Sequence, residues 1–196
     1  MCRKTMTPVA VLIGLVTALY MGGNEVTEFL RYERDRLCWY RFVTASFVHG
    51  DLQHLLVNVV IFSSIVVLFS GELAARSLWL VTVMCGFTAV SFEHIFGKPP
   101  FMPYLIEESY GLSGACYGLL MYCITARVLR RDTVSLLLGA VLISKVTIET
   151  VHQGPLIYSS VEAPAVFGHV GGVVSGALFA VSNKALLAFK TDRAVT

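Results

Sequence analysis

Charged residues are scarce in this chain of 196 residues. Asp, Glu, Lys and Arg make up only 14% of it, whereas 56% of the residues are hydrophobic. Soluble domains usually carry about 25% charged residues, so the composition excludes an ordinary soluble domain and favours a membrane protein. The formal net charge is only +2 and the charges are scattered through loops, so we expect no nucleic-acid partner.

Cysteine pairs and metal-binding motifs are also lacking. The five cysteines, Cys2, Cys38, Cys85, Cys116 and Cys123, form no pairwise motif, so they predict no disulfide framework. No ligand spacing of the HExxH kind occurs, and we expect neither a metal nor another cofactor. Because the chain also lacks low-complexity segments, internal repeats and domain boundaries, residues 1–196 are predicted to form a single membrane domain.

Six apolar segments come near the length of a membrane-spanning helix, which is about 20 residues for roughly 30 Å of hydrocarbon. No Ala-x-Ala-like cleavage site follows the first segment, so we expect it to be retained as a span. Most basic residues near the segment ends fall on the side of the membrane where both termini lie. Basic residues favour the cytoplasmic side, so both termini are predicted to be cytoplasmic. The prediction is an all-α membrane protein with six transmembrane helices. The segments are 7–23, 52–70, 77–92, 112–126, 133–151 and 164–183.

The connection 24–51 is long, lies on the predicted outer side and carries several aromatic residues. Trp39, Tyr40 and Phe42 have the amphipathic character that suits the membrane interface, so lipids are expected partners.

Polar residues in the predicted spans are candidates for function, because they are costly in lipid. The stretch HGDLQHLLVN contains His49, His54 and Asn58 near the outer end of the second segment. His54 and Asn58 are four residues apart and therefore share a helical face.

The fourth segment opens with Gly111-Leu112-Ser113-Gly114. Backbone N–H groups in a first helical turn, here around Leu112 and Gly114, lack intrahelical partners and can donate to an oxyanion. Tyr117 follows Ser113 by one turn and lies on the same face. This arrangement favours acyl transfer with a serine nucleophile.

The sixth segment carries His169 within GHVGG. Gly172 and Gly176 form a GxxxG pair, as do Gly114 and Gly118 in the fourth segment, and such pairs let two helices approach closely in lipid. Close approach is what a serine–histidine hydrogen bond requires. The serine and both span histidines fall near the outer ends of their segments, so three segments converge on one depth.

Each feature also has a structural interpretation. A glycine-flanked serine or a GxxxG pair in a membrane helix is usually a packing feature, and the agreement in depth is what favours Ser113 as nucleophile and His169 as base. Cys116 is a rival nucleophile without a basic neighbour and is interpreted as a packing residue. No carboxylate lies at this depth in the second, fourth or sixth segment, so no Ser-His-Asp triad is expected and the Tyr117 ring is left to orient the imidazole.

Taken together, GLSG followed by Tyr117, HGDLQHLLVN upstream and GHVGGVVSG downstream resemble the rhomboid intramembrane serine proteases. The resemblance covers the whole six-span layout. It implies a dyad of Ser113 and His169. It also implies an oxyanion site made by His54 and Asn58 beside backbone N–H groups, with Tyr117 stacked on the imidazole.

One departure concerns the first outer loop. Rhomboid proteases commonly carry a Trp-Arg pair there, whereas this chain reads Trp39-Tyr40-Arg41, so Tyr40 takes the place of the tryptophan. For Arg41 and for His49, substrate contact and a structural role both stay open.

A second departure points to a subfamily. Lys145 and Glu149 are four residues apart in the fifth segment and can pair on one face. Together with the short chain and the ISKVTIETVHQGP stretch, this pair makes the sequence resemble the rhombosortases. These are bacterial inner-membrane enzymes that process proteins with a C-terminal Gly-Gly anchor segment. The implied substrate is such a tail, cut near its glycines at a site open to the periplasm. The pair is either structural or supports substrate recognition or the catalytic helices.

Three other functions stay open from the sequence. The chain could be a general rhomboid protease of single-span substrates. A catalytically silent rhomboid-like protein would bind membrane clients, and a small transporter or channel would use its intramembrane His, Lys and Glu for transport. The serine, the histidine and the shallow depth of the polar cluster favour the protease.

Overall fold

The computed structural model describes residues 3–102, 105–154 and 165–195, and it is predominantly helical. Apolar runs form the long helices, and two of these begin at an aspartate that accepts a backbone N–H. Asp51 accepts from His54 at 2.8 Å, and Asp132 accepts from Val134 at 3.0 Å. The elements are α1 Arg3–Met21, α2 Gly23–Leu30, β1 Tyr32–Glu33, α3 Arg41–Thr44, η1 Ala45–Phe47, α4 Leu52–Leu68, α5 Ala75–Phe96, β2 Glu108–Ser109, α6 Ser113–Val128, α7 Thr133–His152 and α8 Val166–Val195.

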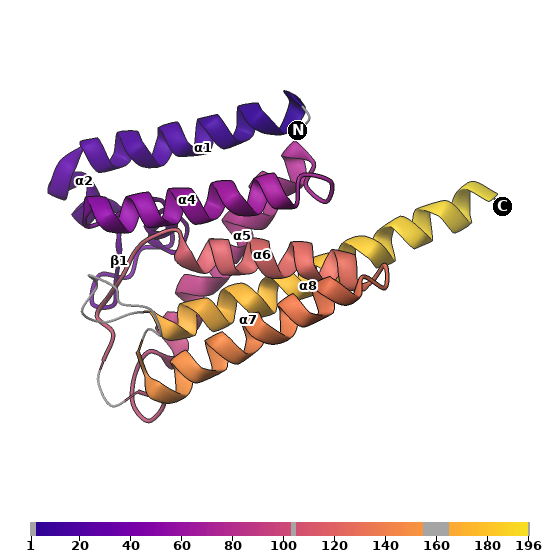
Figure 1. Ribbon diagram of the computed structural model, residues 1–196. Helices are drawn as coiled ribbons and strands as arrows, with labels where there is room; N and C mark the ends of the chain where they lie inside the picture. Colours follow the sequence, from indigo (N-terminus) through magenta and orange to yellow (C-terminus); the bar gives the residue numbers. More distant parts are fainter. Residues whose placement is uncertain (1–2, 103–104, 155–164, 196) are drawn as a thin grey trace.

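The long helices form a bundle in which α6 takes the central place. Helix α6 contacts α4, α5, α7 and α8. Figure 1 shows that α1 begins and α8 ends at one end of the bundle, while α2, β1 and the start of α6 lie at the other end. The starts of α4, α6 and α8 therefore share the end that carries the polar residues of the sequence.

Each of the six predicted apolar segments forms a helix, but not every helix is long enough to cross a membrane alone. By length and composition, α5, α7 and residues Val166–Ala185 of α8 qualify among the described residues. Two bent pairs, Thr7–Met21 with Gly23–Leu30 and Arg41–Phe47 with Leu52–Leu68, raise the number to as many as five. Helix α6 has only 16 residues, fewer than the about 20 that span the hydrocarbon.

The surface and the core differ as expected for helices in lipid. Helix α4 exposes Leu56 and Val60, and α7 exposes Leu137 and Val141. By contrast, most of α6 is buried, including Leu119. A short central helix covered by longer apolar ones keeps its polar first turn away from the hydrocarbon.

A two-stranded ladder ties the outer loop to the start of α6. Strand β1 pairs antiparallel with β2, with Tyr32 opposite Ser109 and Glu33 opposite Glu108. The backbone N–H of Gly111 also donates to the carbonyl of Ala45, at 2.9 Å. These bonds fix the chain just before it enters α6.

Candidate active site

Ser113 is the first residue of α6, and the chain reaches it through a glycine that the geometry requires. Gly111 has a φ of +106°, a conformation that residues with a Cβ rarely adopt. A Cβ at this position would also collide with the His54 ring. The glycine therefore lets the chain pass His54 and places Ser113 at a helix start, where backbone N–H groups are free.

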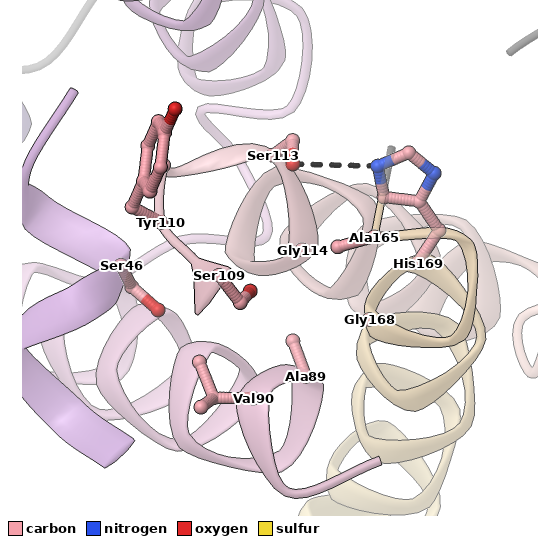
Figure 2. A pocket seen from close by; sticks show the side chains of 11 residues that line it. Ser46, Ala89, Val90, Ser109, Tyr110, Ser113, Gly114, Ala165, Gly168 and His169 are labelled. Carbon is pink, nitrogen blue, oxygen red and sulfur yellow. Dashed lines mark hydrogen bonds between the residues drawn. The ribbon is translucent and has the colours of Figure 1, made fainter. Parts of the chain in front are cut away.

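His169 lies in the first turn of α8 and faces Ser113. Its Nε2 atom is 3.3 Å from Ser113 Oγ, as the dashed line in Figure 2 shows. The preceding residue, Gly168, donates its N–H to Glu93 Oε2 at 2.8 Å, and Glu93 is fully buried in α5. A carboxylate at a helix N-terminus is favourable, so Glu93 anchors the turn that carries the imidazole.

Glycines make the close approach of α6 and α8 possible. A Cβ on Gly172 would overlap the carbonyl oxygen of Gly114, and one on Gly176 would overlap that of Gly118. The two GxxxG pairs noted in the sequence thus face each other across this interface. Because the two backbones are in contact along these glycines, the start of α8 lies next to the start of α6.

Tyr117 lies one turn below Ser113 and stacks on the imidazole. The rings of Tyr117 and His169 have centroids 4.2 Å apart and an interplanar angle of 20°. The phenol hydroxyl accepts a hydrogen bond from Lys145 Nζ and donates to Glu149 Oε2 at 3.3 Å. Two side chains of α7 therefore hold the stacked ring in place through its hydroxyl.

Glu149 is the residue that the sequence analysis did not connect to the imidazole. Its Oε2 atom is 3.4 Å from Nδ1 of His169, and its Oε1 is 2.5 Å from Lys145 Nζ. The side chain is 3% exposed. Depth was compared only among the second, fourth and sixth segments, although Glu149 lies in the last turn of α7, at the same end of the bundle. Extending that comparison to the fifth segment would have found it.

His54 and Asn58 lie on α4 beside Gly111, two residues before Ser113. A Cβ on Gly111 would be 3.6 Å from Asn58 Nδ2, and this buried amide nitrogen has no hydrogen-bond partner among the described residues. The His54 ring packs edge-on against that of His49, with centroids 5.1 Å apart. A buried donor without a partner is costly, which makes the amide available to a negatively charged oxygen.

His49 and Arg41 take part in the scaffold. His49 is 1% exposed, and its Nε2 accepts the N–H of Leu112 at 3.4 Å. Arg41 donates to Glu33 at 2.9 Å and to the carbonyl of Glu28 at 3.3 Å. This hydrogen bond from Arg41 lowers the pKa of the Glu33 carboxyl from its usual value. Both side chains thus hold the outer loop and the start of α6 in place.

A small cavity opens beside Ser113 and His169. Its volume is about 20 Å³, roughly the space of one water molecule. Figure 2 shows Ala89 and Val90 of α5 on one side and Ser109 and Tyr110 on another. The other residues around it are all small: Ser46, Gly111, Gly114, Ala165 and Gly168.

A bound metal ion and the Cys116 thiol are the two alternatives to a serine nucleophile. Among the described residues, no three His, Cys, Asp or Glu side chains are grouped so as to hold a metal ion. Cys116 is 2% exposed and packs in the main hydrophobic core. Its burial agrees with the interpretation of this residue as a packing residue.

Comparison with known protein families matches residues 36–183 to the rhomboid domain. The match spans most of the chain, and the chain therefore belongs to the rhomboid family. Family membership and the long apolar helices indicate a multi-pass membrane protein, and the family supports an intramembrane serine protease that acts on membrane proteins. No curated protein gave a match to this chain.

Proposed function

We propose that this protein is an intramembrane serine endopeptidase of the rhombosortase type. Ser113 is the nucleophile and His169 is the general base. The substrate is a membrane-anchored protein that ends in a Gly-Gly anchor segment, cut near those glycines. In this proposal, residues 1–196 form one domain with six spans and cytoplasmic termini in a bacterial inner membrane, and the site opens toward the periplasm.

The observation that carries the proposal is the 3.3 Å contact between Ser113 Oγ and His169 Nε2. As Oγ attacks the peptide carbonyl carbon, its proton passes to Nε2. When the C–N bond breaks, this proton goes to the leaving amine and an acyl-enzyme ester is left. Water then attacks the ester, gives its proton to Nε2 and releases the acid, with the proton returning to Oγ.

The oxyanion that forms during attack requires donors near Ser113. The buried amide nitrogen of Asn58 has no hydrogen-bond partner among the described residues, and the first-turn N–H groups of Ser113 and Gly114 are free of intrahelical partners. The His54 ring lies beside Gly111, two residues before Ser113. Preorganised donors of this kind stabilise developing negative charge in a site of low dielectric constant.

The lining of the cavity supports a glycine at the cleavage site. Most of the residues around it are glycine, alanine or serine, so a substrate backbone without side chains can come close to Ser113. Glycines also let a substrate helix unwind, because they weaken a helix by about 1 kcal/mol each relative to alanine. Both effects favour a Gly-Gly segment over a typical apolar span, which is the general rhomboid substrate.

The decisive test is co-expression of the protein with secreted proteins that carry Gly-Gly tails, followed by intact-mass analysis of their C-termini. We expect shortened tails with the wild type and full-length tails with Ser113→Ala or His169→Ala. Cys116→Ser serves as the matched control and should still process the tails, because the thiol is a packing group. The product mass also distinguishes hydrolysis from transfer to an amine.

Labelling with a serine-directed fluorophosphonate separates activity from substrate choice. If the wild type is labelled at Ser113 but leaves the tails intact, the enzyme is a rhomboid protease of other single-span substrates. Absence of labelling at Ser113 in folded protein would instead favour a silent, client-binding rhomboid.

A further inference from the structure

We propose that Glu149 is a positioning residue that completes a Ser113–His169–Glu149 triad. Its carboxylate accepts a hydrogen bond from Nδ1–H of His169 and so holds the imidazole with Nε2 free to take the serine proton. This inference rests on the proposed roles of Ser113 and His169. It adds a third group, contributed by α7, to a site that the sequence assigned to α4, α6 and α8.

The two ring nitrogens of His169 have different partners. Nε2 is 3.3 Å from Ser113 Oγ and Nδ1 is 3.4 Å from Glu149 Oε2. Figure 2 shows the second nitrogen directed away from Ser113. A neutral imidazole carries a single N–H, and an ionised carboxylate can only accept a hydrogen bond. The hydrogen therefore belongs on Nδ1, which leaves the Nε2 lone pair facing the serine hydroxyl.

The carboxylate is itself held in place by α6 and α7. Lys145, one turn earlier on α7, pairs with Oε1 at 2.5 Å, and Tyr117 donates to Oε2 at 3.3 Å. The Lys145 ammonium also donates to the Tyr117 hydroxyl. A buried carboxylate is tolerated when it is paired and hydrogen-bonded. Lys145 thus compensates its charge, and Tyr117 links it to the ring that stacks on His169.

The arrangement matters most while the proton is on the imidazole. Transfer from Oγ to Nε2 creates an imidazolium ion, whose Nδ1–H points at the Glu149 carboxylate. The carboxylate stabilises this ion without taking the proton, which goes on to the leaving amine, as with the acid of a Ser-His-Asp triad. A purely structural Lys145–Glu149 pair would hold α7 in place but would have no effect on this step.

The test measures the rate constant of fluorophosphonate labelling at Ser113 in purified wild type, Glu149→Gln, Glu149→Asp and Thr147→Ala. Thr147 is an exposed residue of the same helix, bonded to the carbonyl of Ile143, and its variant should react as the wild type does. Replacing the triad aspartate by asparagine lowers kcat about 10⁴-fold in a serine protease. Because Tyr117 also orients His169, we expect a decrease on the order of 10²-fold for Glu149→Gln and an intermediate rate for Glu149→Asp.

A second measurement addresses the tautomer directly and needs no Glu149 variant. In wild-type protein with ¹⁵N-labelled histidine, NMR shifts assigned by comparison with His169→Ala should show the hydrogen on Nδ1. This measurement decides the question if Glu149→Gln does not fold.

The outcomes separate this inference from the proposed function. If the wild type reacts at Ser113 and folded Glu149→Gln reacts equally fast, or if the hydrogen is found on Nε2, Glu149 is only structural and the dyad stands. If the folded wild type does not react at Ser113, the proposed function fails, and the triad fails with it.

Discussion

Helix α6 has two interfaces that are built in different ways. Toward α8 it presents glycines, and the two backbones touch, with Gly172 against Gly114 and Gly176 against Gly118. Toward α7 it presents a large polar side chain, Tyr117, which bonds to Lys145 and Glu149. The first interface sets the distance between Ser113 and His169. The second sets the orientation of the imidazole, so position and orientation depend on different residues.

The largest effect is expected from breaking the glycine interface with Gly172→Ala. The new Cβ would overlap the carbonyl oxygen of Gly114, and backbone cannot move aside as a flexible side chain can. Overpacking costs about 1–3 kcal/mol and occasionally more, and here it also moves His169 away from Ser113. We expect a lower Tm in detergent and loss of fluorophosphonate labelling.

Gly14→Ala is the matched control for this variant. Gly14 is an exposed helical glycine with no neighbouring atom within 4 Å of an added Cβ. It should keep the wild-type labelling rate and a Tm no lower than that of the wild type, because alanine is the better helix former. Wild-type labelling by Gly172→Ala would show that the backbone contact does not set the Ser113–His169 distance.

A smaller effect is expected at the other interface from Tyr117→Leu compared with Tyr117→Phe. The leucine removes the ring that stacks on His169, whereas the phenylalanine keeps the ring and removes only the hydroxyl. Aromatic stacking contributes about 0.5–1.5 kcal/mol, so Tyr117→Leu should label up to about tenfold more slowly than Tyr117→Phe. Equal labelling rates for the two variants would mean that the stacked ring does not orient the imidazole.

The smallest effect is expected from Gly139→Ala on α7. An added Cβ would lie 3.2 Å from a methyl group of Ile124, which is a side-chain atom and can shift. Alanine also gains about 1 kcal/mol in helix propensity over glycine. We expect the labelling rate to change by less than about twofold and the Tm to stay near that of the wild type. A large loss of labelling would show that the α6–α7 interface is as rigid as the α6–α8 interface.

Much of the helical framework could be predicted from the sequence, because a long continuous apolar run in lipid satisfies all its backbone hydrogen bonds within the segment by forming a helix. The predicted segment 133–151 matches α7 Thr133–His152, and 112–126 matches α6 Ser113–Val128. The start of α7 follows from its Asp132 cap. The ladder between Tyr32–Glu33 and Glu108–Ser109 could not be predicted, since two-residue strands leave no periodic signal.

The candidate site divides in the same way. Ser113 and His169 could be selected because they lie at one depth on helices with glycine pairs, and Tyr117 because it lies one turn from Ser113 on the same face. The contact of Glu149 with His169 could not be found by matching depth among three helices. Nor did the sequence show that Arg41 donates to Glu33 and to the carbonyl of Glu28, because these partners lie in β1 and α2, and elements this short leave little periodic signal.

The sequence by itself determined that this chain forms apolar helices and how far along each helix a polar residue lies, because that position follows from counting residues at about 1.5 Å each. Only the tertiary structure decided how each helix is rotated and which helix lies beside it. Rotation depends on how side chains of different helices fit together, and that fit turns Glu149 toward His169 rather than toward lipid.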